Sequence, residues 1–223
     1  MPEYRLGKRP GNFGKTYPAE VLTPAEVARL ISACGRGPSG LRNRALIVCM
    51  WRAGLRISEA LALYPKDIDA HAGTITVLHG KGNKRRTVGV DPTALAVIER
   101  WLEQRRQLGL NGRHPVFCTI AHDEFGGPGR PIRSAYVRMM VKRAATRAGI
   151  EKRVHPHGFR HTHAYELANE GTPVHVIQAQ LGHNSLATTD RYLRHIAPVL
   201  VVRTMQARSW PSEVEPAASN TAP

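Results

Sequence analysis

Apolar residues recur at helical spacing over most of the chain. Thr23, Pro24 and Glu26 form the capping pattern of a helix start, and Val27 and Leu30 then lie on one face. A glycine-rich loop is expected at 35–40. The same spacing predicts further helices at about 41–53, 57–63, 92–102, 134–148, 157–170, 173–181 and 186–195.

One segment changes to the pattern of strands. Residues 74–78 and 86–90 are rich in Thr, Val and Ile, and they flank the basic sequence Gly-Lys-Gly-Asn-Lys at 80–84. This arrangement predicts a hairpin or a short three-stranded sheet with a basic tip. The fold class is therefore expected to be mainly α with a small antiparallel β-sheet (α+β).

The charge of the chain points to a polyanionic partner. Lysine and arginine number 32 against 17 acidic residues, and the formal net charge is +15. The longest apolar runs, such as 45–51, are too short to span a bilayer, so nucleic acid is favoured over a membrane. Three widely separated cysteines are typical of reduced thiols, and a cytoplasmic, nucleoid-associated location is expected.

The two ends of the chain differ from its middle. Residues 1–21 are basic and rich in Gly and Pro, which predicts a flexible arm. Residues 211–223 are rich in Pro, Ala and Ser, which predicts a disordered tail. One folded domain is expected between them, at 22–210.

A tyrosine follows a group of cationic and imidazole side chains. Tyr192 comes after His183 and the sequence His-Gly-Phe-Arg-His at 157–161. A phenol that attacks a phosphodiester needs such positive charge to stabilise the phosphoryl oxygens. Taken alone, Tyr192 also fits a packing residue at the edge of the core. Likewise, Arg56 and Glu59 fit a local ion pair one helical turn apart.

Five motifs in order resemble the catalytic domain of tyrosine site-specific recombinases, the phage integrase family. They are Gly-Leu-Arg-Ile-Ser-Glu at 54–59, the hairpin tip at 80–84, His-x-x-Arg-His at 157–161, Leu-Gly-His at 181–183, and Tyr192. The resemblance covers about residues 22–200.

The resemblance implies a role for each matching residue. Tyr192 attacks the scissile phosphate and forms a 3′-phosphotyrosine, while Arg56 and Arg160 bind the non-bridging oxygens. Lys81 protonates the departing 5′-oxygen. His157 acts as general acid and base, and His183 hydrogen-bonds the phosphate. Supporting roles fall to Glu59 and His161.

The implied activity is DNA strand breaking and rejoining through a Holliday junction, in integration, inversion or resolution, as in mobile genetic elements. No metal and no nucleotide cofactor is implied. The implied partners are a double-stranded DNA recombination site, three further copies in a homo-tetramer, and an accessory DNA-binding protein. DNA contacts are expected from the basic residues Lys84, Arg85, Arg86, Arg133, Arg138 and Lys142.

The chain departs from the family pattern in three places. Phe159 stands where leucine is usual, and Val-Gly-Val at 88–90 replaces a more usual Val-Pro-Leu. Family members typically carry a helical core-binding domain of about a hundred residues before the catalytic one, and here about twenty residues precede it. DNA affinity is therefore expected from the basic face, the arm or protein contacts.

Three alternatives remain beside the recombinase. A catalytically silent DNA-binding regulator would have the same charge, and a type IB topoisomerase would use the same chemistry. The histidines at 155, 157, 161 and 163 form a candidate metal site, but no Glu or Cys pattern accompanies them. The apolar segment 199–210 packs either on its own domain or on a neighbouring protomer.

Overall fold

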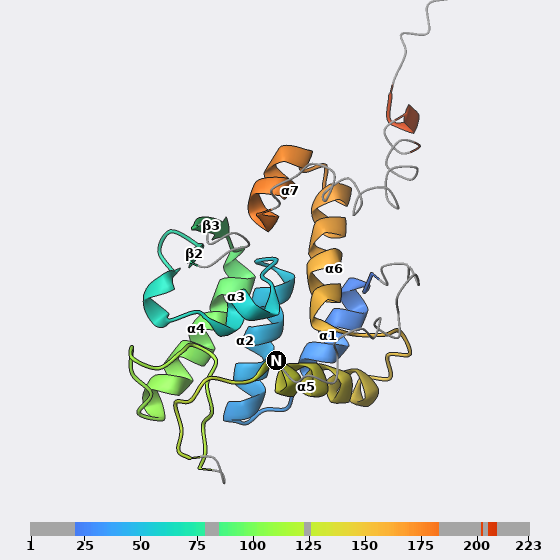
Figure 1. Cartoon of the computed structure of the whole chain (residues 1–223). Helices are drawn as coiled ribbons and strands as arrows, with labels where there is room; N and C mark the ends of the chain where they lie inside the picture. The colour runs from blue at the N-terminus through green and yellow to red at the C-terminus, as the bar shows by residue number, and fades with distance from the viewer. Residues whose placement is uncertain (1–20, 79–84, 123–125, 183–201, 203–204, 209–223) are drawn as a thin grey trace, which may run out of the picture.

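The protein is a mainly helical domain with one small sheet, which confirms the expected fold class (Figure 1). Helix α2 (Pro38–Trp51) runs through the centre and packs against α4 (Pro92–Gln107) and α6 (Pro156–Asn169). The computed structural model describes residues 21–78, 85–122, 126–182, 202 and 205–208.

The remaining helices are short or lie at the periphery. Helix α1 contacts α5, and α7 packs on α6 at the opposite end of the molecule (Figure 1). Their bounds are α1 Pro24–Ser32, α3 Ile57–Leu61, the 3₁₀ turn η2 Pro65–Asp67, α5 Ser134–Arg147 and α7 Val174–Leu181. Helices α1, α3, α5 and α7 confirm the predictions to within about two residues at each end, whereas η2 was not predicted and α4 continues to Gln107, five residues beyond its predicted end. The expected helix at 186–195 lies outside the described residues.

The first two helices start differently. At α1 the predicted capping box is present, with the Glu26 N–H donating to Thr23 Oγ1 at 3.2 Å and the Thr23 N–H donating to Glu26 Oε2 at 2.7 Å. Helix α2 begins at Pro38, three residues before the predicted start, so the loop expected at 35–40 is shorter. Its N-cap is Gly37, which offers no side-chain oxygen, and Pro38 takes the first helical position.

The sheet has three antiparallel strands in the order β1-β2-β3. Strand β2 (Thr74–Val77) lies between β1 (Ile68–Asp69) and β3 (Arg86–Gly89). In the register of β2 and β3, Thr74 faces Gly89. Strand β3 is therefore an edge strand, and α7 packs against it.

Two apolar clusters form the interior. The larger one surrounds α2, whose residues 45–50 are all buried, and it includes side chains from α1, α4, α5 and the sheet. The smaller cluster joins α6 to α7 through Ala164, Ala168, Ile177 and Leu181. This second core is small. Polar contacts at the C-terminal end of α7 therefore also help to hold the helix in place.

Arg52 links three helices at the end of α2. Its Nε donates to Asp91 Oδ2 at 2.7 Å, and Nη1 donates to Glu166 Oε2 at 3.0 Å. Asp91 also caps α4 by accepting from the Ala94 N–H at 3.0 Å. This network fixes the ends of α2 and α4 against the middle of α6.

The cysteines are free and buried, as the sequence predicts for reduced thiols. Within the described part of the chain, every helix is too short or too polar to cross a membrane.

Candidate active site

The turn between α2 and α3 is built around Gly54. Its φ is +63°, and a Cβ at this position would lie 2.7 Å from Cδ2 of His163 on α6. Only glycine fits this conformation without displacing that ring. The turn thus brings the start of α3, and with it Arg56, directly against α6.

Arg160 joins the same turn to two other segments. This side chain is almost wholly buried, with 1% of the residue exposed. Its Nη1 donates to the Gly54 carbonyl at 2.5 Å, and its Nη2 donates to the carbonyl of Leu181 at the end of α7. A charged group at such depth needs partners of this kind, so Arg160 holds the α2–α3 turn, α6 and the end of α7 together.

Glu59 is a buried carboxylate held by two arginines. It accepts from the Arg56 backbone N–H and Nη1, both at 2.8 Å, and from Arg86 Nη1 and Nη2, both at 2.9 Å. Burial alone would raise the pKa of Glu59, but the hydrogen bonds and charges of Arg86 and Arg56 lower it to about 2. Glu59 is therefore ionised at neutral pH and fixes the Arg56 side chain.

The first turn of α6 carries the imidazoles. His155 is the N-cap, and its Nδ1 accepts from the Gly158 N–H at 2.8 Å. The rings of His157 and His161 meet edge to face, with centroids 4.5 Å apart. Although part of His157 faces solvent, partial burial and then the positive charge of Arg160, His155 and Arg56 lower its pKa to about 4. His157 is consequently neutral near pH 7.

The C-terminal end of α7 lies against Arg86. Gly182 caps the helix in the left-handed conformation, with φ +61°, as the sequence predicts for a helix ending at 181. A Cβ there would lie 2.6 Å from both Cδ and Nε of Arg86. The C-terminal end of α7 therefore lies beside the Arg56–Glu59–Arg86 cluster.

The structure thus brings together Arg56, Glu59, His157, Arg160 and His161, which the sequence predicted as site residues. The predicted site residues Lys81, Lys84, His183 and Tyr192 lie outside the described residues.

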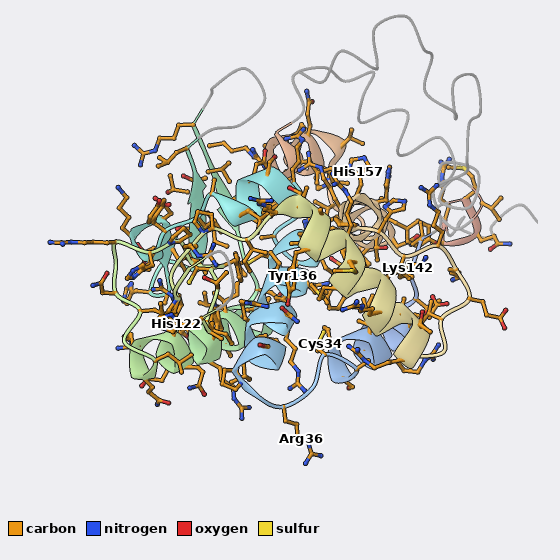
Figure 2. All side chains as sticks on the ribbon, turned by 60° about the horizontal axis from the view of Figure 1, so that its bottom comes forward. Cys34, Arg36, His122, Tyr136, Lys142 and His157 are labelled. Carbon is orange, nitrogen blue, oxygen red and sulfur yellow. The ribbon has the colours of Figure 1, made fainter. Side chains whose placement is uncertain are left out.

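The expected DNA contacts occupy two kinds of position. Arg85 is exposed, whereas Arg86 is directed at Glu59 and has only 13% of its side chain exposed. Helix α5 carries Arg133 at its N-cap and exposes Arg138 and Lys142, while its other face is apolar and buried. Figure 2 shows Lys142 and Tyr136 along this helix, with His157 above it in that view.

A cavity of about 410 Å³ opens at the start of α5. Its lining includes Arg42, Arg130, Arg133 and Tyr136. The Arg42 guanidinium lies over the Tyr136 ring and donates to its hydroxyl at 2.6 Å. The cavity at the start of α5 is therefore lined by apolar side chains together with several cationic ones, and Arg42 is itself buried beside Tyr136.

Two polar residues of the site were not predicted as active-site residues, and the sequence named His163 only as a candidate metal ligand. His163 is buried against Gly54, and neither of its ring nitrogens has a hydrogen-bond partner among the described residues. Gln180 on α7 bonds to both backbone groups of Gly89 on β3. These contacts join residues far apart in the chain, and no local pattern signals them.

The described residues do not form a metal centre. Across 21–78, 85–122 and 126–182, no three His, Cys, Asp or Glu side chains gather as ligands, and this includes the four histidines of α6 and its N-cap.

The site can be compared with known proteins. A sequence model of the phage integrase family matches residues 20–197. The chain belongs to the phage integrase family. This finding confirms the resemblance drawn from the five motifs. Arg56, Glu59, His157, Arg160 and His161 all lie within the matched region of this integrase-family chain.

Individual family members agree with this assignment. Tyrosine recombinase XerC of Xanthomonas axonopodis pv. citri is 35% identical over 193 residues, which are 85% of this chain and 60% of the relative. The crystal structure of XerA recombinase superimposes with a TM-score of 0.71 at 26% identity, covering 92% of this chain and 72% of that one. XerH site-specific recombinase, bound to a palindromic difH substrate, gives 0.67 at 26% identity, covering 83% and 52%.

This integrase-family chain spans about 60% of the length of the curated relatives it matches. The comparisons therefore establish the fold and the family of the matched region, but not the activity of the whole protein.

Proposed function

We propose that this protein is a site-specific DNA recombinase that breaks and rejoins DNA through a 3′-phosphotyrosyl intermediate. The observation that carries the proposal is the meeting of Arg56 and Arg160 at the Gly54 turn, from opposite halves of the chain. Guanidinium groups suit the geometry of phosphate oxygens, and two arginines that converge on one turn, Arg160 buried and Arg56 partly exposed, suit a single bound phosphate better than an extended DNA-binding surface.

The proposed reaction exchanges one phosphodiester bond for another. The Tyr192 hydroxyl attacks phosphorus, so that a Tyr–O–P bond forms and the bond from phosphorus to the 5′-oxygen breaks. His157 accepts the phenolic proton, and Lys81 donates a proton to the departing 5′-oxygen. Attack by a 5′-hydroxyl of a second strand reverses these steps, so neither ATP nor a metal ion enters the balance.

The electrostatics of the described residues support these roles. Glu59 neutralises part of the charge of Arg56 and Arg86 and holds Arg56 in place. His157 has its pKa lowered to about 4 and is therefore neutral and able to accept a proton near pH 7. A bound phosphodiester anion would favour the protonated imidazole, which helps His157 take the proton as the reaction begins.

The proposed DNA surface combines the start of α5 with the hairpin. Arg133, Arg138 and Lys142 on α5 and Arg85 beside β3 are exposed cations, and Lys84 precedes them in the chain. They would contact phosphates across the site, and sequence would be read in the adjoining groove. Arg86, in contrast, is proposed to act through Glu59.

The proposed assembly follows from the chemistry. Exchange of two duplexes requires four active sites, so we expect a homo-tetramer on two copies of a DNA site, with or without an accessory DNA-binding protein. In this proposal residues 22–210 form the catalytic domain, 1–21 a basic arm and 211–223 a tail. The DNA of the nucleoid would be the substrate.

Covalent capture in cells tests the proposal and identifies the site. Cells expressing the protein are lysed in denaturant, DNA that stays attached to the purified protein is sequenced, and the Tyr192→Phe variant serves as the control. The proposal predicts one recurrent sequence with a break at a fixed position, absent from the control. Recovery of DNA from neither protein would favour a catalytically silent DNA-binding protein, and equal recovery from both would exclude Tyr192 as the attacking residue.

A further inference from the structure

Helix α5 exposes an apolar side chain in the middle of a basic face. Met139 is 46% exposed, and Ala135, one turn earlier on the same face, is exposed as well. The opposite face of the helix is buried in the larger apolar cluster through Val137, Met140 and Val141. The orientation of α5 is therefore fixed, and Met139 cannot turn inward without exposing that buried face.

Cations border this apolar strip on both sides. In a helix of about 3.6 residues per turn, Lys142 and Arg143 come three and four residues after Met139 and so project on opposite sides of it. Arg138 adds a third exposed cation on the side of Lys142. The helix carries no acidic residue, and none of these three cations forms an ion pair within the described part of the chain. Their charge is therefore available to a polyanion.

This arrangement matches the cross-section of a DNA major groove. The groove is about 12 Å wide, admits one α-helix, and has phosphates along both walls and base edges along its floor. A helix seated there meets phosphates with its flanking cations and base edges with the side chains between them. Thymine is the base that offers an apolar group in this groove, its C5-methyl. Met139 and Ala135 have no hydrogen-bond donor in their side chains, so thymine methyl groups are the feature that they fit.

The position of α5 in the fold agrees with this comparison. The helix packs against α3, which begins at the N-cap residue Arg56, and against α6, which carries His157. Figure 2 shows α5 across the near face of the molecule, with Lys142 on it and His157 above it in that view. A duplex bound at Arg56 and His157 would therefore pass close to α5.

We propose that Met139, together with Ala135, determines DNA sequence preference by contacting the C5-methyl groups of thymine in the major groove. This inference rests on the proposed function, because it names how the recombinase would choose its site. The flexible, polarisable side chain of methionine can adjust to the methyl groups of neighbouring thymines. Burial of one methyl group changes affinity by about fourfold, so the contact is large enough to measure.

The chain offers matched variants that keep the fold. Met139→Ala removes the apolar side chain from an exposed helical position and retains a strong helix former there. Met139→Leu keeps an apolar side chain of similar size. Leu108→Ala is the control, because Leu108 is also exposed, by 39%, and lies at the C-terminal end of α4. Lys142→Ala is the reference for loss of a phosphate contact.

The experiment uses the full chain and has two steps. First, wild-type protein binds a pool of DNA duplexes of random sequence, and the bound fraction is sequenced. Affinities are then measured for the selected duplex and for a copy in which each preferred thymine is replaced by uracil, which removes only the C5-methyl group. The same two duplexes are tested with every variant.

The proposal predicts that the wild type selects thymine at one or two positions and binds the uracil duplex about fourfold more weakly. Met139→Ala should bind the two duplexes equally well, whereas Met139→Leu and Leu108→Ala should discriminate between them as the wild type does. Lys142→Ala should weaken binding to both duplexes by the same factor.

Two results would overturn the role of Met139. They are a wild-type protein without thymine preference, and a Met139→Ala protein that still discriminates between the two duplexes. Either result leaves the recombinase proposal intact. The proposed function fails separately, if wild-type protein forms no covalent adduct with nicked copies of the selected duplex. A thymine preference that depended on Met139 in such a protein would still support the contact, in a DNA-binding protein that does not break strands.

Discussion

Arg86 and Glu59 form a two-point ion pair between strand β3 and helix α3. Each terminal nitrogen of Arg86 donates to one carboxylate oxygen of Glu59 at 2.9 Å, and only 2% of the Glu59 side chain is exposed. The same carboxylate holds Arg56 at 2.8 Å. The geometry of Arg56, the arginine proposed to bind phosphate, thus depends on a residue that the sequence placed among the expected DNA contacts.

Replacing Arg86 is expected to weaken the fold. In Arg86→Ala the buried Glu59 keeps only Arg56 as a charged partner, so the free energy of unfolding should fall by about 2 kcal/mol. Arg86→Lys should recover part of it, because lysine keeps the charge but loses the two-point geometry. Denaturant unfolding measures the free energy of unfolding of both variants.

The matched control is Arg106→Ala on α4. Arg106 also pairs with a glutamate, Glu103, but their side chains are 71% and 51% exposed. Its loss should change stability by less than about 0.5 kcal/mol. If Arg86→Ala and Arg106→Ala lost equal stability, the buried Arg86–Glu59 pair would stabilise the protein no more than an exposed ion pair does.

His163 is expected to make the protein sensitive to acid. Burial, and then the positive charge of Arg52 and Arg160, lower its pKa from 6.5 to about 4. Between these values the unfolded chain binds a proton that the folded protein does not, so stability falls as pH drops from about 6.5 towards 4. The free energy of unfolding should therefore be lower at pH 5 than at pH 7, by about 2 kcal/mol from this residue.

His163→Leu should remove that part of the acid sensitivity. Within the part of the chain that the structure describes, neither ring nitrogen of His163 has a hydrogen-bond partner, so an apolar side chain removes no bond seen at this site. Urea unfolding at pH 7 and pH 5 gives the comparison. An unchanged difference between the two pH values in His163→Leu would show that His163 titrates normally.

The rate of DNA cleavage should hold down to mildly acidic pH. At limiting DNA the rate reports the free enzyme, in which His157 has a pKa of about 4. Lowering the pH from 7.5 to 5.5 should then cost less than about twofold, whereas a histidine of pKa 6.5 would lose about tenfold of its neutral form. A rate that follows a pKa near 6.5 would contradict the proposed electrostatics, and His157→Gln would show how much of the rate depends on this residue.

The basic face of α5 should determine the salt dependence of DNA binding. Arg138→Ala and Lys142→Ala should each weaken binding to all DNA sequences alike. They should also reduce the slope of log K against log salt concentration by about 1. Arg36, an exposed arginine between α1 and α2, provides the control (Figure 2). Equal effects of Arg36→Ala and Lys142→Ala would mean that α5 holds no preferred DNA surface.

The sequence predicted most of the fold because local chemistry determines it. Thr23 and Glu26 cap α1 within one turn, and Gly182 ends α7 in the left-handed conformation. The start of α2 was missed because Gly37 provides no capping side chain. Helix periodicity and strand alternation, in contrast, hold over whole elements and are read reliably.

The sequence named residues that the structure brings together, but it did not predict the contacts between them. Arg56, His157 and Arg160 were recognisable by motif, whereas the Arg86–Glu59 pair and the Gln180–Gly89 pair cross 27 and 91 residues of chain. Arg86 appeared as one more cation of a basic hairpin. Only its hydrogen bonds in the folded structure show that Arg86 points to Glu59 on α3.

Covalent capture on a nicked DNA substrate tests the central claim most directly. The nick lies close to the cleavage position, so that a short strand diffuses away after cleavage and the phosphotyrosine cannot be rejoined. Wild-type protein, with a metal chelator present, should form an adduct that withstands denaturing electrophoresis. Tyr192→Phe should form none while it still binds DNA. An adduct of equal yield in Tyr192→Phe, or none in wild type on its mapped site, would contradict the account.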